Sequence, residues 1–408
     1  MNVIDLFAGA GGLSEGFRQA GFNIIAHVEM DQNASLTLKT REAFYYLKER
    51  NKLDLYKKYL KNELTRDELY SNIPEAILDK VINAEISDLT INDIYNRIDS
   101  LLGNEKVNLV IGGPPCQAYS LVGRARDPKK MKNDPRNYLY KEYIRFLKKY
   151  SPDYFLFENV LGLLSAGKGE IFEKIKLEMN RAGYNIDYKV LNSKDFGVLQ
   201  SRRRIILIGW KKNLNFNFPS FEVEESGSTI RDLFYDLPEI QAGEIKKPGN
   251  TYKNEVKSYV ITNGIRSLDW DILSQHQARP QRELDLEIYK YCVEVWNSER
   301  RKVKYNQLPY HLITHKNTKT FLDRFNIIPY DGISHTIVSH ISKDGHYYIH
   351  PDIKQNRSIS IREAARIQSF PDSYYFETSR TAAFKQIGNA VPPMMAKKIA
   401  LKLKSILF

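Results

Sequence analysis

Residues 2–12 read Asn-Val-Ile-Asp-Leu-Phe-Ala-Gly-Ala-Gly-Gly, an apolar run that passes into a glycine-rich turn. The apolar run predicts a buried strand, and the turn predicts the entry to a helix. The glycines follow the pattern Gly9-x-Gly11-x-x-Ser14, which lacks the third glycine of a dinucleotide-binding fingerprint. An ordinary strand–helix turn would have the same pattern. The stretch therefore predicts the first strand and helix of an α/β sheet, and a candidate ligand-binding loop.

Outward from this stretch, short apolar runs alternate with longer amphipathic stretches as far as about residue 210. The strand candidates are 2–7, 23–29, 107–111, 153–158, 185–191 and 204–210, and helices are expected between them, for example over 138–149 and 170–182. This alternation predicts a parallel sheet with helices on both faces and right-handed crossovers.

The alternation fades from about 212 to 355, where prolines, glycines, histidines and aromatic residues scatter without a clear period. This part of the chain predicts a separate, irregular domain that is rich in loops. Helical patterning returns at 360–367, and 391–407 predicts an amphipathic basic helix opened by Pro392 and Pro393.

The amino-acid composition indicates the class of protein and the charge of its partner. The chain has 408 residues, of which 42% are hydrophobic and 27% charged, as in a soluble globular protein long enough for two domains. Lysine and arginine exceed aspartate and glutamate by 61 − 49 = 12. That surplus favours a polyanionic partner, although an AT-biased genome that favours lysine would produce it too.

Three further features predict a cytoplasmic protein without a membrane segment. The chain has no apolar run long enough to span a membrane, and the expected first strand leaves no room for a signal peptide. Cys116 and Cys292 lack the spacing of metal or disulfide pairs, which fits a reducing cytoplasm.

A second informative stretch is 112–120, Gly-Gly-Pro-Pro-Cys-Gln-Ala-Tyr-Ser, which follows the apolar run 107–111. Cys116 is thus expected in a proline-fixed turn after a buried strand, a position that suits a nucleophile better than core packing. The strand candidate 153–158 ends in Glu158-Asn159. A thiol and a carboxylate at the ends of two strands can face one substrate from two sides.

Six blocks together carry a family resemblance. They are 5–12, the Pro-Pro-Cys-Gln block 114–117, Glu-Asn-Val 158–160, Gln-Ser-Arg-Arg-Arg 200–204, 362–371 and Gln-Ile-Gly-Asn-Ala-Val-Pro-Pro 386–393. Because these blocks occur in the order that the family shows, the chain resembles a bacterial DNA (cytosine-5)-methyltransferase. The resemblance implies a Rossmann-like sheet that binds S-adenosylmethionine, and a second, smaller and irregular target-recognition domain. It divides the chain into 1–212 plus 372–408 for catalysis and cofactor binding, and 213–371 for target recognition and hinge.

Residues 37–80 depart from the usual spacing of the family and predict a charged helical insertion between the second and third strands. Charged helical faces usually meet only water, so a solvated structural decoration is the main interpretation. An additional contact to DNA or to a protein partner is the alternative.

The resemblance also implies which residues bind the cofactor. They are Phe7, Gly9, Gly11, Gly12, Glu29, Met30, Glu85, Ile86, Pro114, Leu139 and Asn389. Glu29 can accept the ribose hydroxyl groups, while Phe7 and Met30 flank the adenine. Glu85 stands where the family more often has aspartate.

The catalytic residues implied by the resemblance are Cys116, Gln117, Glu158, Asn159, Arg202 and Arg204. Cys116 would attack carbon 6 of cytosine, and Glu158 would relieve the charge that builds on ring nitrogen 3. Arg204 would reach the carbonyl oxygen of the base, with Arg202 in support. Leu199 stands where the family has proline. The alternative for the adjacent arginines is a solvated strand end.

DNA contacts are expected from two further segments. Residues 117–136 form a basic loop, including Arg124 and Arg126, that suits a lid closing on phosphates. Thr336-Ile337 matches the Thr–aliphatic pair of the recognition domain, with Ser339 and His340 beside it. His335, His340, His346 and His350 do not have the spacing of a metal site.

The predicted function is methylation of carbon 5 of cytosine in a specific duplex DNA sequence, with the target base flipped out of the helix. A cognate restriction endonuclease acting on the same sequence is a possible partner in the cytoplasm. Two alternatives stay open: an RNA cytosine-5 methyltransferase, and a catalytically inactive DNA-binding homologue.

Overall fold

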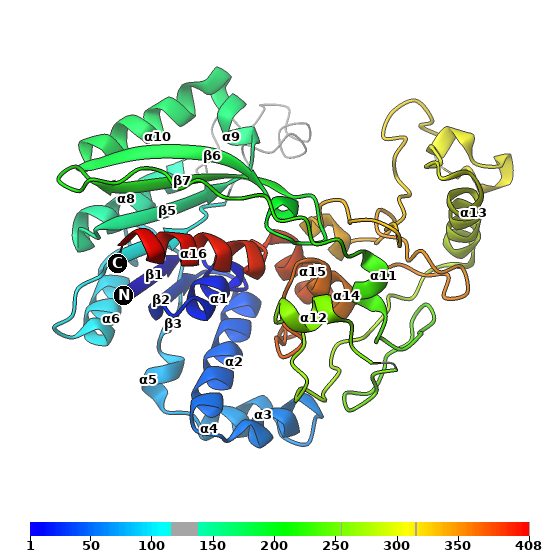
Figure 1. The fold of residues 1–408 in the computed structure, drawn as a ribbon, viewed down its shortest axis with the longest axis horizontal. Helices are drawn as coiled ribbons and strands as arrows, with labels where there is room; N and C mark the ends of the chain where they lie inside the picture. The colour runs from blue at the N-terminus through cyan, green and yellow to red at the C-terminus, as the bar shows by residue number, and fades with distance from the viewer. Residues whose placement is uncertain (116–137, 254, 315, 408) are drawn as a thin grey trace.

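The computed structural model describes residues 1–115, 138–253, 255–314 and 316–407. Within these residues, a seven-stranded sheet has the strand order β3-β2-β1-β4-β5-β7-β6 (Figure 1). The strands are β1 (Asn2–Leu6), β2 (Asn23–Glu29), β3 (Val81–Asn83), β4 (Leu109–Gly112), β5 (Tyr154–Asn159), β6 (Tyr184–Asn192) and β7 (Arg203–Lys211). The six predicted strands are therefore present within two residues of their predicted ends. The short strand β3 is not among these six candidates, but it is the third strand that the resemblance implied after the insertion 37–80.

The sheet is mixed, so the expectation of a wholly parallel sheet is wrong. Strands β1 to β5 pair in parallel, whereas β7 pairs antiparallel with both β5 and β6. The reason lies in the link between β6 and β7, which spans 193–202 and contains only the 3-10 turn η3 (Ser193–Asp195). A parallel crossover needs a dozen or more residues, so this short link returns the chain antiparallel.

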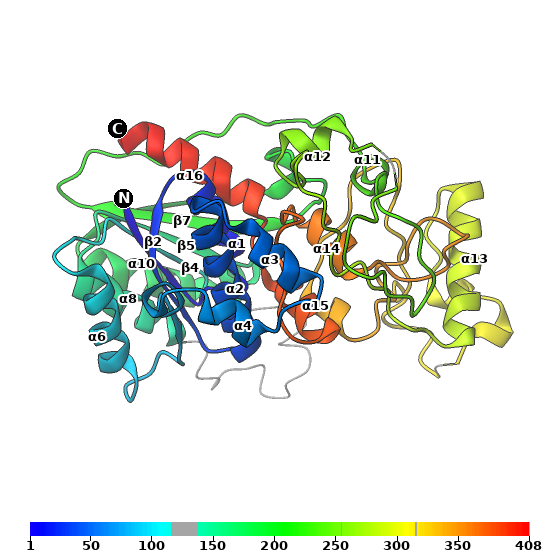
Figure 2. The same ribbon diagram turned by 90° about the horizontal axis from the view of Figure 1, so that it is seen from below.

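Helices cover both faces because neighbouring residues of a strand point to opposite sides. Val3 of β1 belongs to an apolar core that α1 (Gly12–Gln19) and α16 (Pro393–Leu407) complete. Ile4 belongs to a second core, completed by α6 (Ile91–Leu102), α8 (Leu139–Tyr150) and α10 (Glu170–Arg181). Figure 2 shows α16 lying along one face of the sheet.

The last helix packs directly on the first one. A Cβ on Gly16 of α1 would lie 2.4 Å from the backbone nitrogen of Lys397 and 2.5 Å from the carbonyl oxygen of Pro393. Only glycine allows this approach. The two chain ends therefore lie close together, as Figures 1 and 2 both show.

The predicted insertion is helical, with α2 (Gln32–Glu49), α3 (Leu53–Leu60), α4 (Arg66–Ser71) and α5 (Glu75–Leu78) between β2 and β3. Its inner face forms an apolar cluster in which Phe44 and Tyr56 pack with Trp270. The ring centroids of Phe44 and Tyr56 are 5.1 Å apart, and those of Tyr56 and Trp270 are 6.4 Å apart. The insertion thus packs against a segment more than 190 residues away in the sequence.

The insertion also holds the segment that precedes α15 (Arg380–Asn389). The hydroxyl of Tyr59 donates to Glu377 Oε1 at 2.6 Å, and the backbone N–H of Glu377 donates to Thr37 Oγ1 at 2.8 Å. The hydroxyl of Tyr56 donates to the carbonyl oxygen of Ser373 at 2.9 Å. The inner face of the insertion is therefore structural.

Beyond β7 the chain is mostly irregular, as predicted. Its helices are α11 (Ile230–Phe234), α12 (Ser258–Thr262), α13 (Glu283–Glu299) and α14 (Ile361–Ile367), followed by α15 and α16. Helix α13 was not predicted, although the spacing of its buried residues Ile288, Cys292 and Val295 is helical. Burial raises the pKa of the Cys292 thiol to about 12.

One apolar core cluster continues across the predicted domain boundaries, because it contains Ile206, Ile230, Ile337 and Met395. The division of the chain into 1–212 plus 372–408 and 213–371 therefore stays a prediction.

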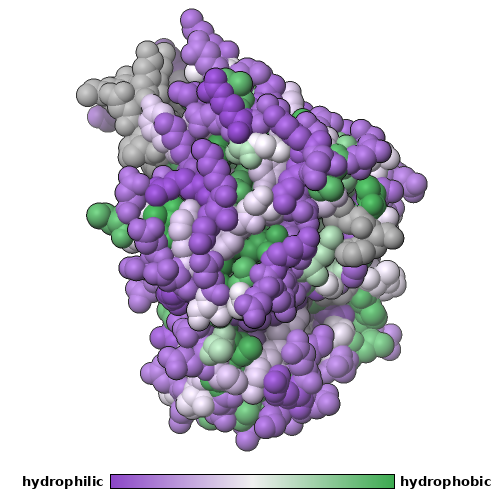
Figure 3. Space-filling model, turned by 90° about the vertical axis from the view of Figure 1, so that its left-hand side faces the viewer, coloured by the Kyte–Doolittle hydropathy of each residue, from purple (hydrophilic) through white to green (hydrophobic). Residues whose placement is uncertain are grey.

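The end of the molecule beside the chain termini has a mainly hydrophilic surface, with hydrophobic residues in small areas (Figure 3). In the part of the chain that the structure describes, no helix is both long and apolar enough to cross a membrane.

Candidate active site

The strand ends place predicted site residues in one row at an edge of the sheet. The registers pair Glu29 with Asn83 and end at Leu6, Gly112 and Phe157 on the other three strands. The next residues on those strands, Phe7, Gly113 and Glu158, therefore lie at the level of Glu29. Phe7, Glu29 and Glu158 are the predicted site residues of this row. The strand order reverses between β1 and β4. An open α/β sheet binds its ligand beyond the strand ends at such a point, so the row is the candidate site.

The glycine loop after β1 is closed on one side and open on the other. Phe7, Gly9 and Gly11 have φ values of +54°, +56° and +74°. A Cβ on Gly11 would lie 2.6 Å from the side chain of Leu38, and one on Gly12 would lie 2.2 Å from the carbonyl oxygen of Val391. A Cβ on Gly9 would meet nothing within 4 Å. A ligand can therefore approach the backbone at Gly9.

Glu29 ends β2 and holds this loop. Its Oε2 accepts the backbone N–H of Gly9 and its Oε1 accepts that of Asp31, both at 2.7 Å. Burial raises the pKa of Glu29, against the opposing effect of these two N–H groups. A carboxylate accepts about four hydrogen bonds, so Glu29 keeps acceptor capacity for the hydroxyl groups of a ligand.

The other predicted cofactor residues differ in exposure. Those with exposed side chains are Met30, which is 58% exposed, Glu85, and Asn389 at the end of α15. Those with half-buried or buried side chains are Leu139 at the start of α8, Pro114, and Ile86. Ile86 is a core residue at 4% exposure, which leaves its backbone as the part available to a ligand.

Glu158 ends β5 and pairs with Arg204 of β7. Its Oε1 lies 2.8 Å from Arg204 Nε, and the two side chains are 14% and 13% exposed. A Cβ on Gly113 would lie 2.6 Å from Glu158 Oε2. The absence of a side chain at Gly113 therefore makes room for the second carboxylate oxygen, beside the turn that leads to position 116.

Asn159 fixes the same turn from the other side. It is 2% exposed, its Nδ2 donates to the carbonyl oxygen of Pro114 at 3.2 Å, and its Oδ1 accepts the backbone N–H of Val160 at 2.9 Å. Pro114 is two residues before Cys116. Cys116, Gln117, Arg124 and Arg126 themselves lie outside the described residues.

Arg202 has a different environment from Arg204. Its side chain is fully buried, with Nη1 donating to the carbonyl oxygen of Ile337 at 2.6 Å and Nη2 to that of Gly388 at 3.1 Å. Arg202 therefore ties the start of β7 to two distant segments, whereas Arg204 contacts the candidate catalytic acid.

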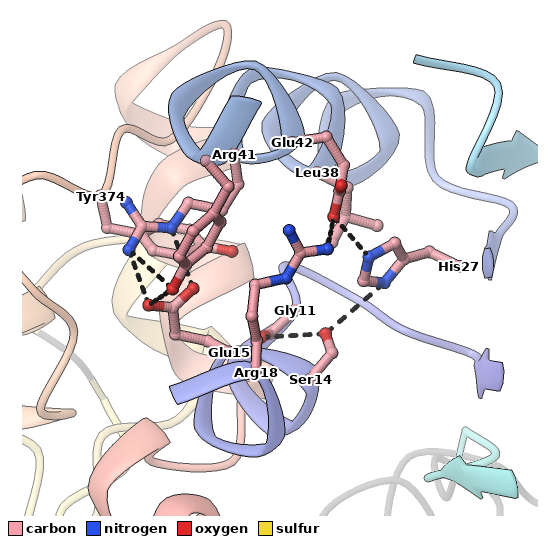
Figure 4. A pocket seen from close by; sticks show the side chains of 10 residues that line it. Gly11, Ser14, Glu15, Arg18, His27, Leu38, Arg41, Glu42 and Tyr374 are labelled. Atoms are coloured by element: carbon pink, nitrogen blue, oxygen red, sulfur yellow. Dashed lines mark hydrogen bonds and ion pairs between the residues drawn. The ribbon is translucent and has the colours of Figure 1, made fainter. Parts of the chain in front are cut away.

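Buried charged side chains lie behind the glycine loop, as Figure 4 shows. Arg41 forms a bidentate ion pair with Glu15: Nε donates to Oε2 at 2.9 Å and Nη2 donates to Oε1 at 2.6 Å. Burial alone would raise the pKa of Glu15, but Arg41 outweighs it and holds that pKa below its usual value. The hydroxyl of Tyr374 donates to the carbonyl oxygen of Ala10, so this cluster supports the loop directly.

A second part of the cluster surrounds His27 of β2. Its Nε2 lies 3.2 Å from Glu42 Oε1 and its Nδ1 lies 3.4 Å from Asp5 Oδ2. Burial alone would lower the pKa of His27, but the hydrogen bonds to the two carboxylates outweigh it and raise that pKa. Arg18 pairs with Glu42 and, against the effect of burial, lowers the pKa of Glu42 to about 2.

An ion pair at the rim of the site was not predicted from the sequence. Lys385 Nζ of α15 lies 2.8 Å from Asp31 Oδ2, and Asp31 caps α2 by accepting the backbone N–H groups of Asn33 and Ala34. Asp31 directly follows Met30. The available signal was the acidic residue at a helix start, which is a typical N-cap, but its partner 354 residues away had no local signal.

The predicted DNA-contacting residues after β7 divide into two kinds. Thr336 Oγ1 donates to the carbonyl oxygen of Ser201 at 2.6 Å, so this hydroxyl serves the fold. Ser339 and His340 open the 3-10 turn η6 (Ser339–Ser342), where Ser339 is half-buried and His340 exposed. A Cβ on Gly388 would lie 2.4 Å from the backbone nitrogen of Ser339. The absence of a side chain at Gly388 therefore lets α15 pack closely against η6.

The other three histidines considered as metal ligands have partners within the fold. His335 Nε2 lies 2.7 Å from the carbonyl oxygen of Tyr347, and burial lowers its pKa to about 4. His346 Nδ1 lies 2.8 Å from the hydroxyl of Tyr289. His350 Nε2 lies 3.6 Å from Glu363 Oε1, and burial lowers its pKa to about 3.

Comparison with known proteins agrees with this geometry. A family model described as C-5 cytosine-specific DNA methylase matches residues 1–74 and 57–405. The chain is 41% identical to the type II methyltransferase M.Bpa9945I of Bacillus paralicheniformis, and the alignment covers 100% of this chain and 99% of that protein. It is 32% identical to the type II methyltransferase M.DdeI of Desulfomicrobium norvegicum, with 99% and 88% covered.

A crystal structure from E. coli matches the whole fold. That protein is encoded within a prophage and assigned as a DNA modification methyltransferase. The TM-score is 0.67 at 25% identity, and the match covers 100% of this chain and 99% of the other. The predicted Rossmann-like methyltransferase sheet is thereby confirmed.

Proposed function

The chain belongs to the family of C-5 cytosine-specific DNA methylases, and on that premise we propose that it methylates carbon 5 of cytosine within a specific sequence of duplex DNA. S-adenosylmethionine is the proposed methyl donor. The enzyme is thus a DNA (cytosine-5-)-methyltransferase that acts in the cytoplasm. The observation that supports this proposal most strongly is the row at the sheet edge, in which Glu29 and Glu158 lie at one level with two strand ends, those of β1 and β4, between them.

The proposed cofactor region is the half of the row formed by β1, β2 and β3. The open backbone at Gly9 and the buried carboxylate of Glu29 fit a nucleoside whose ribose hydroxyls need acceptors. Phe7 and the exposed Met30 would flank the adenine. When bound, S-adenosylmethionine supplies the electrophilic methyl group that carbon 5 receives.

The proposed catalytic region is the half formed by β4, β5 and β7. The Cys116 thiolate adds to carbon 6 of cytosine, forming the Sγ–carbon 6 bond and raising electron density at carbon 5. After carbon 5 is methylated, loss of its proton and departure of the thiolate restore the ring. Attack through a thiolate divides one difficult step into two easier ones.

Glu158 and Arg204 serve the charge that develops on the ring. Glu158 hydrogen-bonds or protonates ring nitrogen 3. Arg204 holds Glu158 Oε1 at 2.8 Å and so leaves Oε2 as the oxygen that can meet the base. By family resemblance, the Arg204 guanidinium also reaches the carbonyl oxygen of the base. Asn159 positions the turn before Cys116 through Pro114.

Carbon 5 of a paired cytosine is not accessible to these groups, so the base must leave the duplex. We propose that 117–136, with Arg124 and Arg126, closes over the flipped nucleotide. Residues 213–371 select the target sequence, with Ser339 and the exposed His340 near the DNA. A restriction endonuclease with the same target is the proposed biological partner.

Trapping on modified DNA tests the nucleophile. Duplex DNA with 5-fluorocytosine at the target should give a covalent complex, because fluorine cannot leave as a proton. The Cys116→Ala variant should give no such complex, and a complex that survives this change would refute the role of Cys116. Transfer to tRNA but not to DNA would favour the RNA alternative, and no transfer to either would favour the inactive homologue.

A further inference from the structure

Half of the net positive charge of the chain falls in a single segment of 25 residues. Residues 300–324 contain one acidic residue, Asp323, and seven basic ones, Arg300, Arg301, Lys302, Lys304, Lys316, Lys319 and Arg324. The net charge of the segment is 7 − 1 = +6, compared with +12 for the chain. All of these basic side chains are exposed except that of Arg324, which is half-buried. Arg300 pairs with Asp331 and Arg301 pairs with Glu299, so the four lysines carry most of the charge that this surface offers to a polyanion.

The same segment exposes two large aromatic side chains. Tyr310 is 93% exposed and Phe321 is 74% exposed. Single exposed apolar side chains are common on protein surfaces, so the informative feature is that these two rings lie in the same segment as the cations. Aromatic side chains among basic ones are typical of nucleic-acid surfaces, because aromatic rings contact bases while cations contact phosphates.

Phe321 is held in place before any partner binds. Its φ is +53°. Arg324 donates from Nε to the carbonyl oxygen of Phe321 at 3.1 Å and from Nη2 to that of Asn317 at 3.0 Å. Asn317 Oδ1 accepts the backbone N–H groups of Lys319 and Thr320, each at 3.1 Å. These bonds close the loop 317–324 around the exposed ring.

The closed loop is anchored to the core of this part of the chain. The guanidinium carbon of Arg324 lies 4.2 Å from the ring centroid of Tyr305, which is 1% exposed. Tyr305 packs with Phe325 and with buried residues of α13. The position of Phe321 is therefore fixed relative to α13, and inserting the ring into a partner costs little conformational entropy.

The segment lies far from the sheet. In Figures 1 and 2, α13 and the yellow chain that follows it form one end of the long axis, and the sheet forms the other end. A partner that touches both the catalytic edge and this segment must be an extended molecule. Duplex DNA satisfies both the length and the charge.

We propose that 300–324 is a second contact surface for the DNA substrate, in which Phe321 is an apolar wedge that enters the base stack while the lysines hold phosphates. This inference rests on the proposed function. Wedges of this kind partly unstack a base step and bend the duplex, and the bent duplex then contacts more of the protein surface. Phe321 is thus a specificity-determining residue that acts at a distance from the methylated base.

The test uses the full chain and two short duplexes, one with the target sequence that bisulfite sequencing of host DNA identifies and one without it. Phe321→Ala should weaken binding to the target duplex by roughly 10-fold, the scale of one base–aromatic contact. Leu268→Ala is the matched control, because Leu268 is 76% exposed and outside the segment, and should bind as the wild type does. Equal binding by wild type and Phe321→Ala would overturn the wedge.

Base unstacking is measured directly with 2-aminopurine placed at successive positions of the target duplex. Binding of the wild type should raise the fluorescence of 2-aminopurine at one base step apart from the flipped cytosine. Phe321→Ala should abolish the rise at that step and leave the signal at the flipped cytosine unchanged. An unchanged fluorescence profile in the variant would contradict the proposal. Methyl transfer by the wild type on the same duplex is measured in parallel. Its absence would refute the proposed function, whereas transfer with unchanged binding by Phe321→Ala would refute only the wedge.

The phosphate contacts have their own measurement. Replacing Lys316 and Lys319 with alanine should reduce the slope of log affinity against log salt by about 0.9 for each phosphate contact that is lost. An unchanged slope would show that these lysines do not face the DNA. Since both side chains are exposed, the double variant is expected to fold as the wild type does.

Discussion

Replacing Arg202 with alanine should destabilise the fold more than the same change at either of its two arginine neighbours. Arg202 donates to the buried carbonyl oxygens of Ile337 and Gly388. A buried polar group left without a partner costs about 1–3 kcal/mol, so the loss of both bonds should cost roughly 2–6 kcal/mol. That is a large part of the 5–15 kcal/mol that typically stabilises a folded protein.

The neighbouring arginines provide the controls. Arg203 is exposed, and Arg203→Ala should change neither the free energy of unfolding nor turnover. Arg204→Ala removes a largely buried ion pair with Glu158. We expect it to lower turnover by about 100- to 1,000-fold, the scale of one lost donor at a developing charge, with a smaller loss of stability than Arg202→Ala causes.

Urea unfolding followed by circular dichroism measures the stability of the three variants, and tritium transfer to DNA measures their turnover. Arg202→Met, which fills space without donating hydrogen bonds, separates lost bonds from lost packing. A free energy of unfolding for Arg202→Ala equal to that of the wild type would refute the structural role of Arg202. Equal stability losses at Arg202 and Arg204 would also contradict the distinction between the two side chains.

Three other predictions follow from the same geometry. Glu158→Gln should lower turnover by about 100- to 10,000-fold while cofactor affinity stays the same, because the carboxyl acts as charge develops on the ring; unchanged single-turnover rates would remove Glu158 from the mechanism. Phe7→Ala and Glu29→Ala should weaken binding of S-adenosylmethionine, the latter by roughly 1.5–3 kcal/mol, and calorimetry that finds wild-type affinity in both would argue against the cofactor site. The pKa of His27 is raised in the folded protein, so its stabilising contribution is present below its unfolded pKa of about 6.5 and is lost as pH rises through the folded value. His27→Asn should therefore cost more stability at about pH 6 than at about pH 9, and an equal cost at both would contradict this assignment.

The sequence predicted the parts of the fold whose signals are local. The apolar runs and glycine turn of 2–12 predicted β1 and the entry to α1, and the site residues at strand ends followed from the order of the elements. The direction of β7 was missed because the predicted strand ends leave a link of twelve residues, 192–203, which is just long enough for a parallel crossover. The observed link, 193–202, has only ten residues. Helix α13 could have been found from the spacing of Ile288, Cys292 and Val295.

Charged residues were the least predictable part. Arg362 and Arg366 belong to a family block with no role assigned from the sequence, and both prove fully buried. Arg366 binds Asp236 and Asp372, with distances of 2.5 Å and 2.6 Å for the shortest bond to each. Because an exposed and a buried arginine look alike in a sequence, and the partners lie 130 and 6 residues away, only the fold shows which charges belong to the core.

The most direct test of the central claim is the chemical identity of the product. Duplex DNA is incubated with the protein and S-adenosylmethionine, digested to nucleosides and measured by mass spectrometry against standards. Methylation at carbon 5 of cytosine predicts 5-methyl-2′-deoxycytidine with the wild-type protein and none with Cys116→Ser. A product methylated on an exocyclic nitrogen of cytosine or adenine, or no methylated nucleoside from DNA that contains the target sequence, would contradict it.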